Sequence, residues 1–184
     1  MRDDDRRALL DGWFRAYANR VLAYLLHRTD PQTAQDVLQE VFVTAFRKAE
    51  DVPQPPLGWL FGTARRLLAN KHRGHRRHDD LMTRLLDDAS AETDPDLADV
   101  KEAFLQTLAT LSPADRDVLT LTGWYDLTPR EAADALGVSA STYAVRLHRA
   151  RKRLAAALDQ AGYRGETPAG QFAAALRGTE VLHG

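Results

Sequence analysis

Three arginine side chains between residues 146 and 153 are spaced to bind DNA. Arg146, Arg149 and Arg153 recur every three to four residues, so a helix would present them on one face together with Thr142. Guanidinium groups pair with phosphate oxygens, and they also read the O6 and N7 atoms of guanine in bidentate fashion. The chemistry predicted for this segment is therefore DNA recognition.

The same segment has an apolar face that would pack against a core. Its members at helical spacing are Tyr143, Leu147, Ala150 and Leu154. A solvated surface helix is the alternative, but the flanking signals favour a DNA-binding helix. We expect DNA contacts from Ser141, Thr142, Arg146, Arg149 and Arg153, and a core position for Tyr143.

The residues just before this helix predict a helix-turn-helix. Thr128 can cap a first helix, Pro129 suits its first position, and Glu131 completes a capping box. Gly137 permits the left-handed conformation that ends this helix, and Ser139 can cap the next one almost at once. In such a unit the second helix enters the major groove.

A second basic segment lies between residues 65 and 77. Arg66, Asn70 and Arg73 share one face of an expected helix. Further positive charge comes from Arg65, Arg76 and Arg77.

Three histidines in the same segment suggest a metal site: His72, His75 and His78. The neighbouring arginines would repel a cation, and no carboxylate or thiolate completes the ligand set. We therefore expect no metal and no cofactor.

Composition narrows the class of protein. The 184 residues carry a net charge of −1 at pH 7 and contain no cysteine, which excludes disulfides and thiolate ligands. The sequence shows no apolar run of membrane-spanning length, no signal peptide, and no phosphate loop or nucleophile motif. We therefore expect a cytoplasmic protein without enzymatic activity.

Hydrophobic spacing predicts an all-α protein of two small helical domains joined by an acidic linker. We expect a domain at residues 1–78, the linker at 79–96, a second domain at 97–160 and a flexible tail at 161–184. In the first domain, Asp30 and Pro31 should begin a helix that packs antiparallel to its predecessor. The predecessor's expected core stripe is Leu10, Trp13, Phe14, Tyr17, Val21, Tyr24 and Leu25.

Three motifs in order resemble a known family. They are the segment Asp36 to Phe46, the segment Gly58-Trp59-Leu60-Phe61 with Ala64, Arg65, Asn70 and Arg73, and the stretch from Leu111-Ser112-Pro113 through Gly137-Val138-Ser139 to Arg151. Together they resemble the extracytoplasmic-function (ECF) group of bacterial RNA polymerase sigma factors, over about Leu9 to Leu158.

The resemblance implies roles for the N-terminal motifs. The polar, net-negative face of Asp36, Gln39 and Glu40 would dock on the clamp helices of the largest polymerase subunit. The basic segment of residues 65 to 77 would bind the minus-ten element and its opened strand, with a base pocket in the loop Glu50 to Leu57. Trp59 and Phe61 could stack on bases, although the position of Trp59 on the apolar stripe favours a core role.

The chain departs from the family pattern at two places. Arg66 stands where asparagine is common, which affects base preference at the minus-ten element. Tyr143, Ala144 and Val145 replace a segment that usually holds a lysine and a serine, so apolar contacts to thymine methyl groups would replace polar ones at the minus-thirty-five element. The linker either mimics RNA phosphates in the polymerase channel or is a plain tether.

The implied partners are core RNA polymerase, double-stranded promoter DNA and the opened minus-ten strand, with an anti-sigma factor as a further candidate. The free chain would be a monomer. One alternative is a helix-turn-helix regulator that acts as a dimer without replacing sigma. Another is a polymerase-binding adaptor without promoter recognition, which only the altered segment 143–145 favours.

Overall fold

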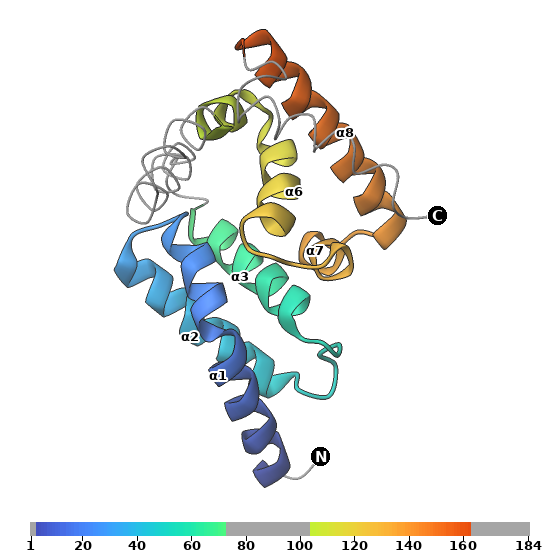
Figure 1. Ribbon diagram of the computed structural model, residues 1–184. Helices are drawn as coiled ribbons and strands as arrows, with labels where there is room; N and C mark the ends of the chain where they lie inside the picture. The colour runs from blue at the N-terminus through green and yellow to red at the C-terminus, as the bar shows by residue number, and fades with distance from the viewer. Residues whose placement is uncertain (1–2, 73–103, 163–184) are drawn as a thin grey trace.

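The computed structural model describes residues 3–72 and 104–162, which form helices joined by turns and loops, without a strand (Figure 1). The labelled helices are α1 (Asp3–Leu26), α2 (Pro31–Arg47), α3 (Leu57–His72), α6 (Pro113–Gly123), α7 (Pro129–Leu136) and α8 (Ala140–Gln160). Residues 104–110 are also helical. The predicted all-α class is confirmed.

Helices α1, α2 and α3 form an N-terminal bundle. The Asp30 carboxylate accepts a hydrogen bond from the Thr33 backbone N–H at 2.9 Å, and Pro31 opens α2, as predicted. Helix α2 then runs back along α1 (Figure 1). Helix α3 packs on both and buries Leu60, Ala64 and Leu68.

One position of the predicted α1 core is wrong. Phe14 is 49% exposed, so the neighbouring helices leave about half of its side chain uncovered. Its ring still packs edge-on against Phe42, with centroids 4.9 Å apart. The neighbouring stripe residues Trp13, Val21, Tyr24 and Leu25 are buried as expected.

The C-terminal domain contains residues 104–110, α6, α7 and α8. The predicted caps are all present: Ser112 caps α6, Thr128 and Glu131 form the capping box of α7, and Ser139 caps α8. Gly137 ends α7 with φ +66°, in the left-handed region. These local signals confirm the helix-turn-helix.

Tyr143 fixes the recognition helix to its domain. The side chain is fully buried, and its hydroxyl donates a hydrogen bond to the backbone oxygen of Val118 on α6 at 2.8 Å. Leu147, Ala150 and Leu154 are buried below it. The expected apolar face of this helix is therefore confirmed.

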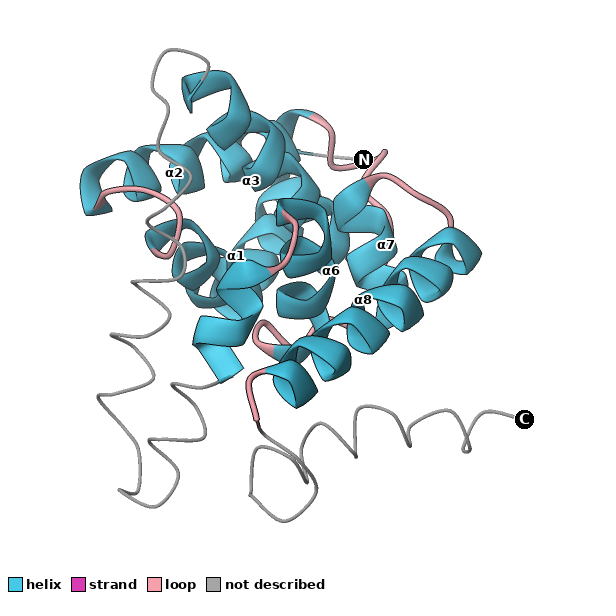
Figure 2. Cartoon of the chain, turned by 90° about the horizontal axis from the view of Figure 1, so that it is seen from above, coloured by secondary structure: helices cyan, strands magenta, loops and turns pink. Residues whose placement is uncertain are grey.

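The two halves pack together and share one hydrophobic core. Helix α7 lies between α3 and α8 and contacts both (Figures 1 and 2). The sequence predicted the helices of each half but not this contact between them. The predicted linker at 79–96, and the tail beyond residue 162, lie outside the described residues.

None of the helices in the described residues could span a membrane. Each is either too short or too polar to cross a bilayer.

Candidate nucleic-acid interface

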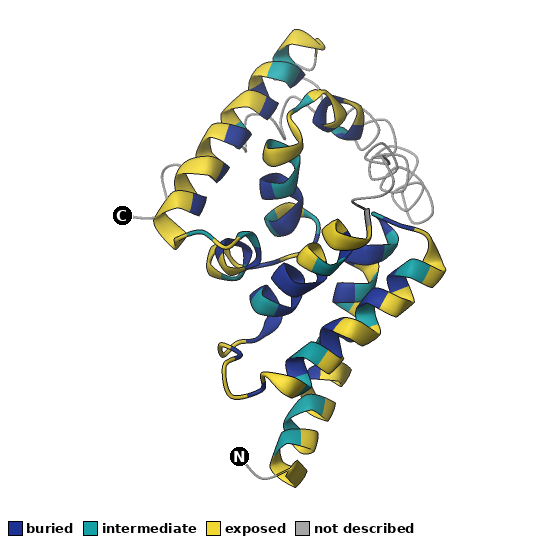
Figure 3. Ribbon diagram, turned by 180° about the vertical axis from the view of Figure 1, so that it is seen from behind, coloured by how far each residue is buried: buried dark blue, intermediate teal, exposed yellow. Residues whose placement is uncertain are grey.

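Helix α8 presents the predicted DNA-binding residues to solvent. Ser141, Thr142, Arg146, Arg149 and Arg153 are all exposed. Figure 3 shows exposed residues, in yellow, along the length of α8. At its N-terminus, the Ser139 hydroxyl accepts a hydrogen bond from the Thr142 backbone N–H at 3.1 Å and donates one to Thr142 Oγ1 at 2.8 Å. The cap therefore also orients Thr142.

The arginines of this face differ in their surroundings. The Nη1 atom of Arg153 lies 2.7 Å from Asp115 Oδ1 at the start of α6, so this guanidinium already has a carboxylate partner. In the described part of the chain, Arg146 and Arg149 have no ion-pair partner. These two side chains are therefore the ones best placed to meet a phosphate or a guanine.

Apolar side chains lie among these polar ones. Val145 is 50% exposed and Ala144 is also exposed, directly before Arg146. These side chains form no hydrogen bonds with water, so burying them against an apolar group such as a thymine methyl group would be favourable. Their exposure fits the expected shift in base preference.

Helix α3 carries the second set of predicted contacts. Arg66 and Asn70 are exposed, and Arg66 Nη2 donates a hydrogen bond to Thr63 Oγ1 at 2.9 Å. Arg65 points elsewhere: its Nη2 atom lies 3.0 Å from Asp117 Oδ2 on α6. Arg73, Arg76 and Arg77, as well as His75 and His78, lie outside the described residues.

The two candidate base-stacking residues of α3 are covered to different degrees. Trp59 is half-buried against the core, in keeping with its expected core role. Phe61 is only 1% exposed, and its ring lies 5.0 Å from that of Tyr24 and 5.9 Å from that of Tyr125. In this arrangement, Phe61 is therefore closed to a base.

Helix α2 presents the predicted polymerase-binding face. Asp36, Gln39 and Glu40 are exposed, and Glu40 Oε1 lies 3.0 Å from Lys71 Nζ on α3. Val43, seven residues after Asp36 and therefore on the same face, is 49% exposed. Val43 was not among the residues predicted for this face, although its position two turns beyond Asp36 indicates it.

A largely buried cluster, which residue spacing did not predict, joins the two halves of the molecule. We define this interdomain cluster as Tyr24, His27, Arg28, Phe61, Asp117 and Tyr125. Arg28 Nη1 donates a hydrogen bond to the Tyr125 hydroxyl at 2.8 Å, and its guanidinium lies 3.8 Å from the Tyr24 ring centroid. Tyr24, His27 and Arg28 lie together at the end of α1, but the other three residues come from distant segments, so no single period connects the set.

Burial dominates the electrostatics of this cluster. It raises the pKa of Tyr125 to about 12, although the Arg28 guanidinium partly opposes the shift. Burial likewise raises the pKa of Tyr24, against the same opposing charge. Both phenols therefore stay protonated at neutral pH and act as neutral partners of Arg28.

Family models match both halves of the chain. Residues 13–78 match sigma-70 region 2, and residues 101–154 match sigma-70 region 4. The first match spans the α2 face and α3, and the second spans the helix-turn-helix.

Individual proteins are similar over most of the chain. The ECF RNA polymerase sigma factor SigM of Bacillus subtilis is 29% identical over 80% of this chain and 93% of its own length. The RNA polymerase sigma-E factor of Streptomyces avermitilis is 30% identical over 68% of this chain and 70% of its own length.

Among the solved structures that share the fold, one contains the sigma factor RpoE of Bartonella quintana in complex with the anti-sigma factor NepR. It aligns with a TM-score of 0.54 at 20% identity and covers 81% of this chain and 96% of that one.

Proposed function

The chain belongs to the ECF group of the sigma-70 family, and from this premise we propose which of its surfaces carry out the family's role. A sigma factor binds core RNA polymerase and directs promoter-specific initiation of transcription. In our assignment, the α2 face binds core, α3 binds the minus-ten element and α8 binds the minus-thirty-five element. The proposed domain bounds are those predicted from the sequence, 1–78 and 97–160.

One observation supports the assignment of α8 above the others. A capped helix, anchored by Tyr143, presents Thr142, Arg146 and Arg149 to solvent as the second helix of a helix-turn-helix. Anchoring matters because the arginines must reach the same base edges in every complex. Val145 would add apolar contact within the same groove.

The α2 face suits a protein partner. Asp36, Gln39 and Glu40 lie on the same face of α2 as the exposed Val43, so an apolar contact would lie beside a polar, negatively charged patch. That arrangement favours a basic partner with an apolar centre. Core polymerase is the partner we propose.

Helix α3 would bind the minus-ten DNA through Arg66 and Asn70, with Arg65 joining them once it leaves Asp117. A cationic surface of this kind suits an opened strand, whose backbone is negatively charged. The side chain of Arg66 is longer than that of the usual asparagine and has no acceptor atom. We therefore infer a different base preference at this element.

Other assignments follow from the family role. Binding to core polymerase and to chromosomal promoters implies a cytoplasmic site of action for a monomeric chain without catalytic chemistry of its own. An anti-sigma factor is a further proposed partner, since the related fold of Bartonella quintana RpoE was solved in complex with one.

Transcription in vitro tests the assignment. The chain is added to sigma-free bacterial core polymerase on fragments of its own genome, and transcript starts are mapped. We expect starts that depend on the chain and share two upstream elements. Binding to core without starts would favour the adaptor, and DNA binding without core binding would favour the regulator.

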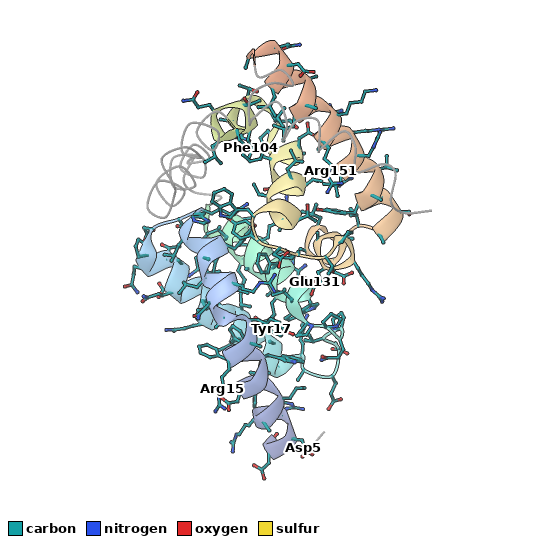
Figure 4. All side chains as sticks on the ribbon, viewed as in Figure 1. Asp5, Arg15, Tyr17, Phe104, Glu131 and Arg151 are labelled. Carbon is teal, nitrogen blue, oxygen red and sulfur yellow. The ribbon has the colours of Figure 1, made fainter. Side chains whose placement is uncertain are left out.

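Two charge variants make this test specific for the proposed surfaces. Asp36→Lys should weaken binding to core, whereas Asp4→Lys, the same charge change on an exposed residue of α1, should not. Arg146→Ala should weaken binding to the minus-thirty-five duplex and lower the slope of log K against log salt by about one if it meets a phosphate. Arg15→Ala on α1 (Figure 4) is its control. An unchanged slope together with unchanged sequence preference would contradict the assignment of Arg146.

A further inference from the structure

An ion pair connects the helix that we assign to core polymerase with the helix that we assign to minus-ten DNA. Glu40 lies on the exposed polar face of α2, together with Asp36 and Gln39. Its Oε1 atom lies 3.0 Å from Nζ of Lys71 on α3. Helices α2 and α3 pack against each other, so the pair crosses the contact between them (Figure 2).

The two carboxylates of the α2 face have different partners. Asp36 Oδ1 accepts a hydrogen bond from the amide of Gln32, one turn earlier on the same helix, at 3.1 Å. A neutral amide leaves the negative charge of Asp36 uncompensated. Glu40 instead pairs with the ammonium group of Lys71, although its side chain is 50% exposed and open to a partner. A basic group that approaches Glu40 must therefore compete with Lys71.

Lys71 borders the face of α3 that we assign to DNA. Arg66 and Asn70 are four residues apart, so they share one face of the helix. Lys71 is also exposed and follows Asn70 directly, about 100° further round the helix. Its pairing with Glu40 shows that this edge of the DNA face lies toward α2. Because a lysine ammonium ends a flexible four-carbon stem, it can exchange a carboxylate for a nearby phosphate.

We propose that Lys71 is a further contact to minus-ten DNA, held by Glu40 in the free chain and released when core polymerase binds Glu40. The inference rests on the proposed function, because the two partners are those assigned to α2 and α3. It adds one residue to the DNA surface and couples that surface to polymerase binding.

Electrostatics sets the direction of this coupling. In the free chain, the carboxylate of Glu40 neutralises Lys71 and repels an approaching phosphate. A cationic group of core polymerase that pairs with Glu40 removes both effects. Coupling between two binding sites is reciprocal, so a phosphate bound to Lys71 in turn leaves Glu40 free for the polymerase. Each partner therefore favours the binding of the other.

Solvent limits the size of the coupling. The Lys71 side chain is 35% exposed and that of Glu40 is 50% exposed, so water and salt screen their attraction. Exposed ion pairs of this kind shift an equilibrium by up to about fivefold. The coupling should also weaken as the salt concentration rises, because the Debye length becomes shorter.

Lys71→Ala in the full chain tests the proposal, because it should move two affinities in opposite directions. Core polymerase should bind the variant more tightly, by up to about fivefold, since Glu40 then has lost the competition from Lys71. The holoenzyme should bind the single-stranded minus-ten segment of the promoter mapped by transcription in vitro more weakly. The slope of log K against log salt should fall by about 0.7 in magnitude, as expected for one phosphate contact to a single strand.

Matched variants separate the ion pair from other effects of charge. Lys48→Ala removes the same charge from an exposed residue at the end of α2, and it should change neither affinity. Lys71→Arg keeps the charge and should keep both wild-type affinities. In a Glu40→Gln background, Lys71→Ala should no longer tighten core binding, because the carboxylate that it releases is absent.

Several results would overturn the proposal. Weaker or unchanged core binding by Lys71→Ala would show that Lys71 does not compete for Glu40. An equal tightening in the Glu40→Gln background would mean that Lys71 acts on the polymerase through its long-range charge. Wild-type affinity and salt slope for the minus-ten strand would show that Lys71 does not meet a phosphate.

Asp36→Lys distinguishes failure of the coupling from failure of the proposed function. If Asp36→Lys leaves core binding unchanged, the α2 face is not the polymerase surface, and the proposed function of this face fails. If Asp36→Lys weakens core binding while Lys71→Ala leaves it unchanged, only the coupling fails. The polymerase measurements need no promoter, so they are independent of the assignment of α3 to minus-ten DNA.

Discussion

Tyr125 of the C-terminal half is buried against the N-terminal half, where its hydroxyl accepts a hydrogen bond from Arg28. Burial raises the pKa of its phenol from 10.0 to about 12, so the neutral form is favoured in the folded protein. A group whose folded pKa is raised contributes stability that is complete below its unfolded pKa. This contribution should be lost as pH rises from about 10 through about 12.

We predict a late tyrosinate transition from Tyr125 in an alkaline titration followed by ultraviolet absorbance. The difference between wild type and Tyr125→Phe should show it near pH 12. Phenylalanine keeps the ring packing against Phe61 but removes the titrating hydroxyl. A difference curve centred near pH 10 would mean that Tyr125 is exposed in the free protein.

At the scale of single elements, the turn of the helix-turn-helix gives a matched pair of variants. A Cβ at Gly137 or at Gly123 would meet no atom within 4 Å, so neither substitution causes a clash. Gly137 has φ +66°, whereas Gly123 is the last residue of α6. Gly137→Ala should cost about 1 kcal/mol of folding free energy, since alanine is strained in the left-handed region.

Gly123→Ala should instead leave stability unchanged or raise it by up to about 1 kcal/mol, because alanine favours the helical state. Urea unfolding of both variants measures the difference. The two variants should therefore change the free energy of unfolding by different amounts, because only residue 137 is in the left-handed region. If both variants destabilise alike, the turn geometry described for α7 and α8 is wrong.

The helix ends could be predicted from the sequence because their causes are local. At Asp30, Ser112, Thr128 and Ser139, the capping oxygen accepts a hydrogen bond from a backbone N–H only three residues away. Residue types and short spacing are then sufficient. The polar face of α2 and the basic face of α8 were found for the same reason, since helical periodicity alone places their members together.

The contacts between elements could not be predicted in this way. Arg65 and Asp117 are 52 residues apart, and no period connects them. Phe14 and Val43 have apolar side chains that are nevertheless about half exposed. Residue type alone does not predict their burial, because it depends on how much of each helix is covered by its neighbours. The close approach of Gly58 to the backbone of Glu131 on α7 likewise depends on the packing of the whole chain.

At the scale of the whole molecule, the shared core changes what the two-domain sequence pattern implies. Two helical units joined by a tether should unfold independently, whereas buried residues from both halves here form one continuous cluster. Coupling between parts with a common core makes unfolding cooperative. The strength of the contact between the two halves should therefore be visible in the heat capacity of the full chain.

We predict that the wild-type chain unfolds in one calorimetric transition, with equal calorimetric and van't Hoff enthalpies. Gly58→Ala should split this transition into two, because a Cβ at residue 58 would collide with the backbone of Glu131 on α7. The bundle and the C-terminal domain would then melt separately while each keeps its own core. Gly12→Ala, which meets no neighbour, should keep the single transition. Two transitions in the wild type would show that the halves are energetically independent despite their shared core.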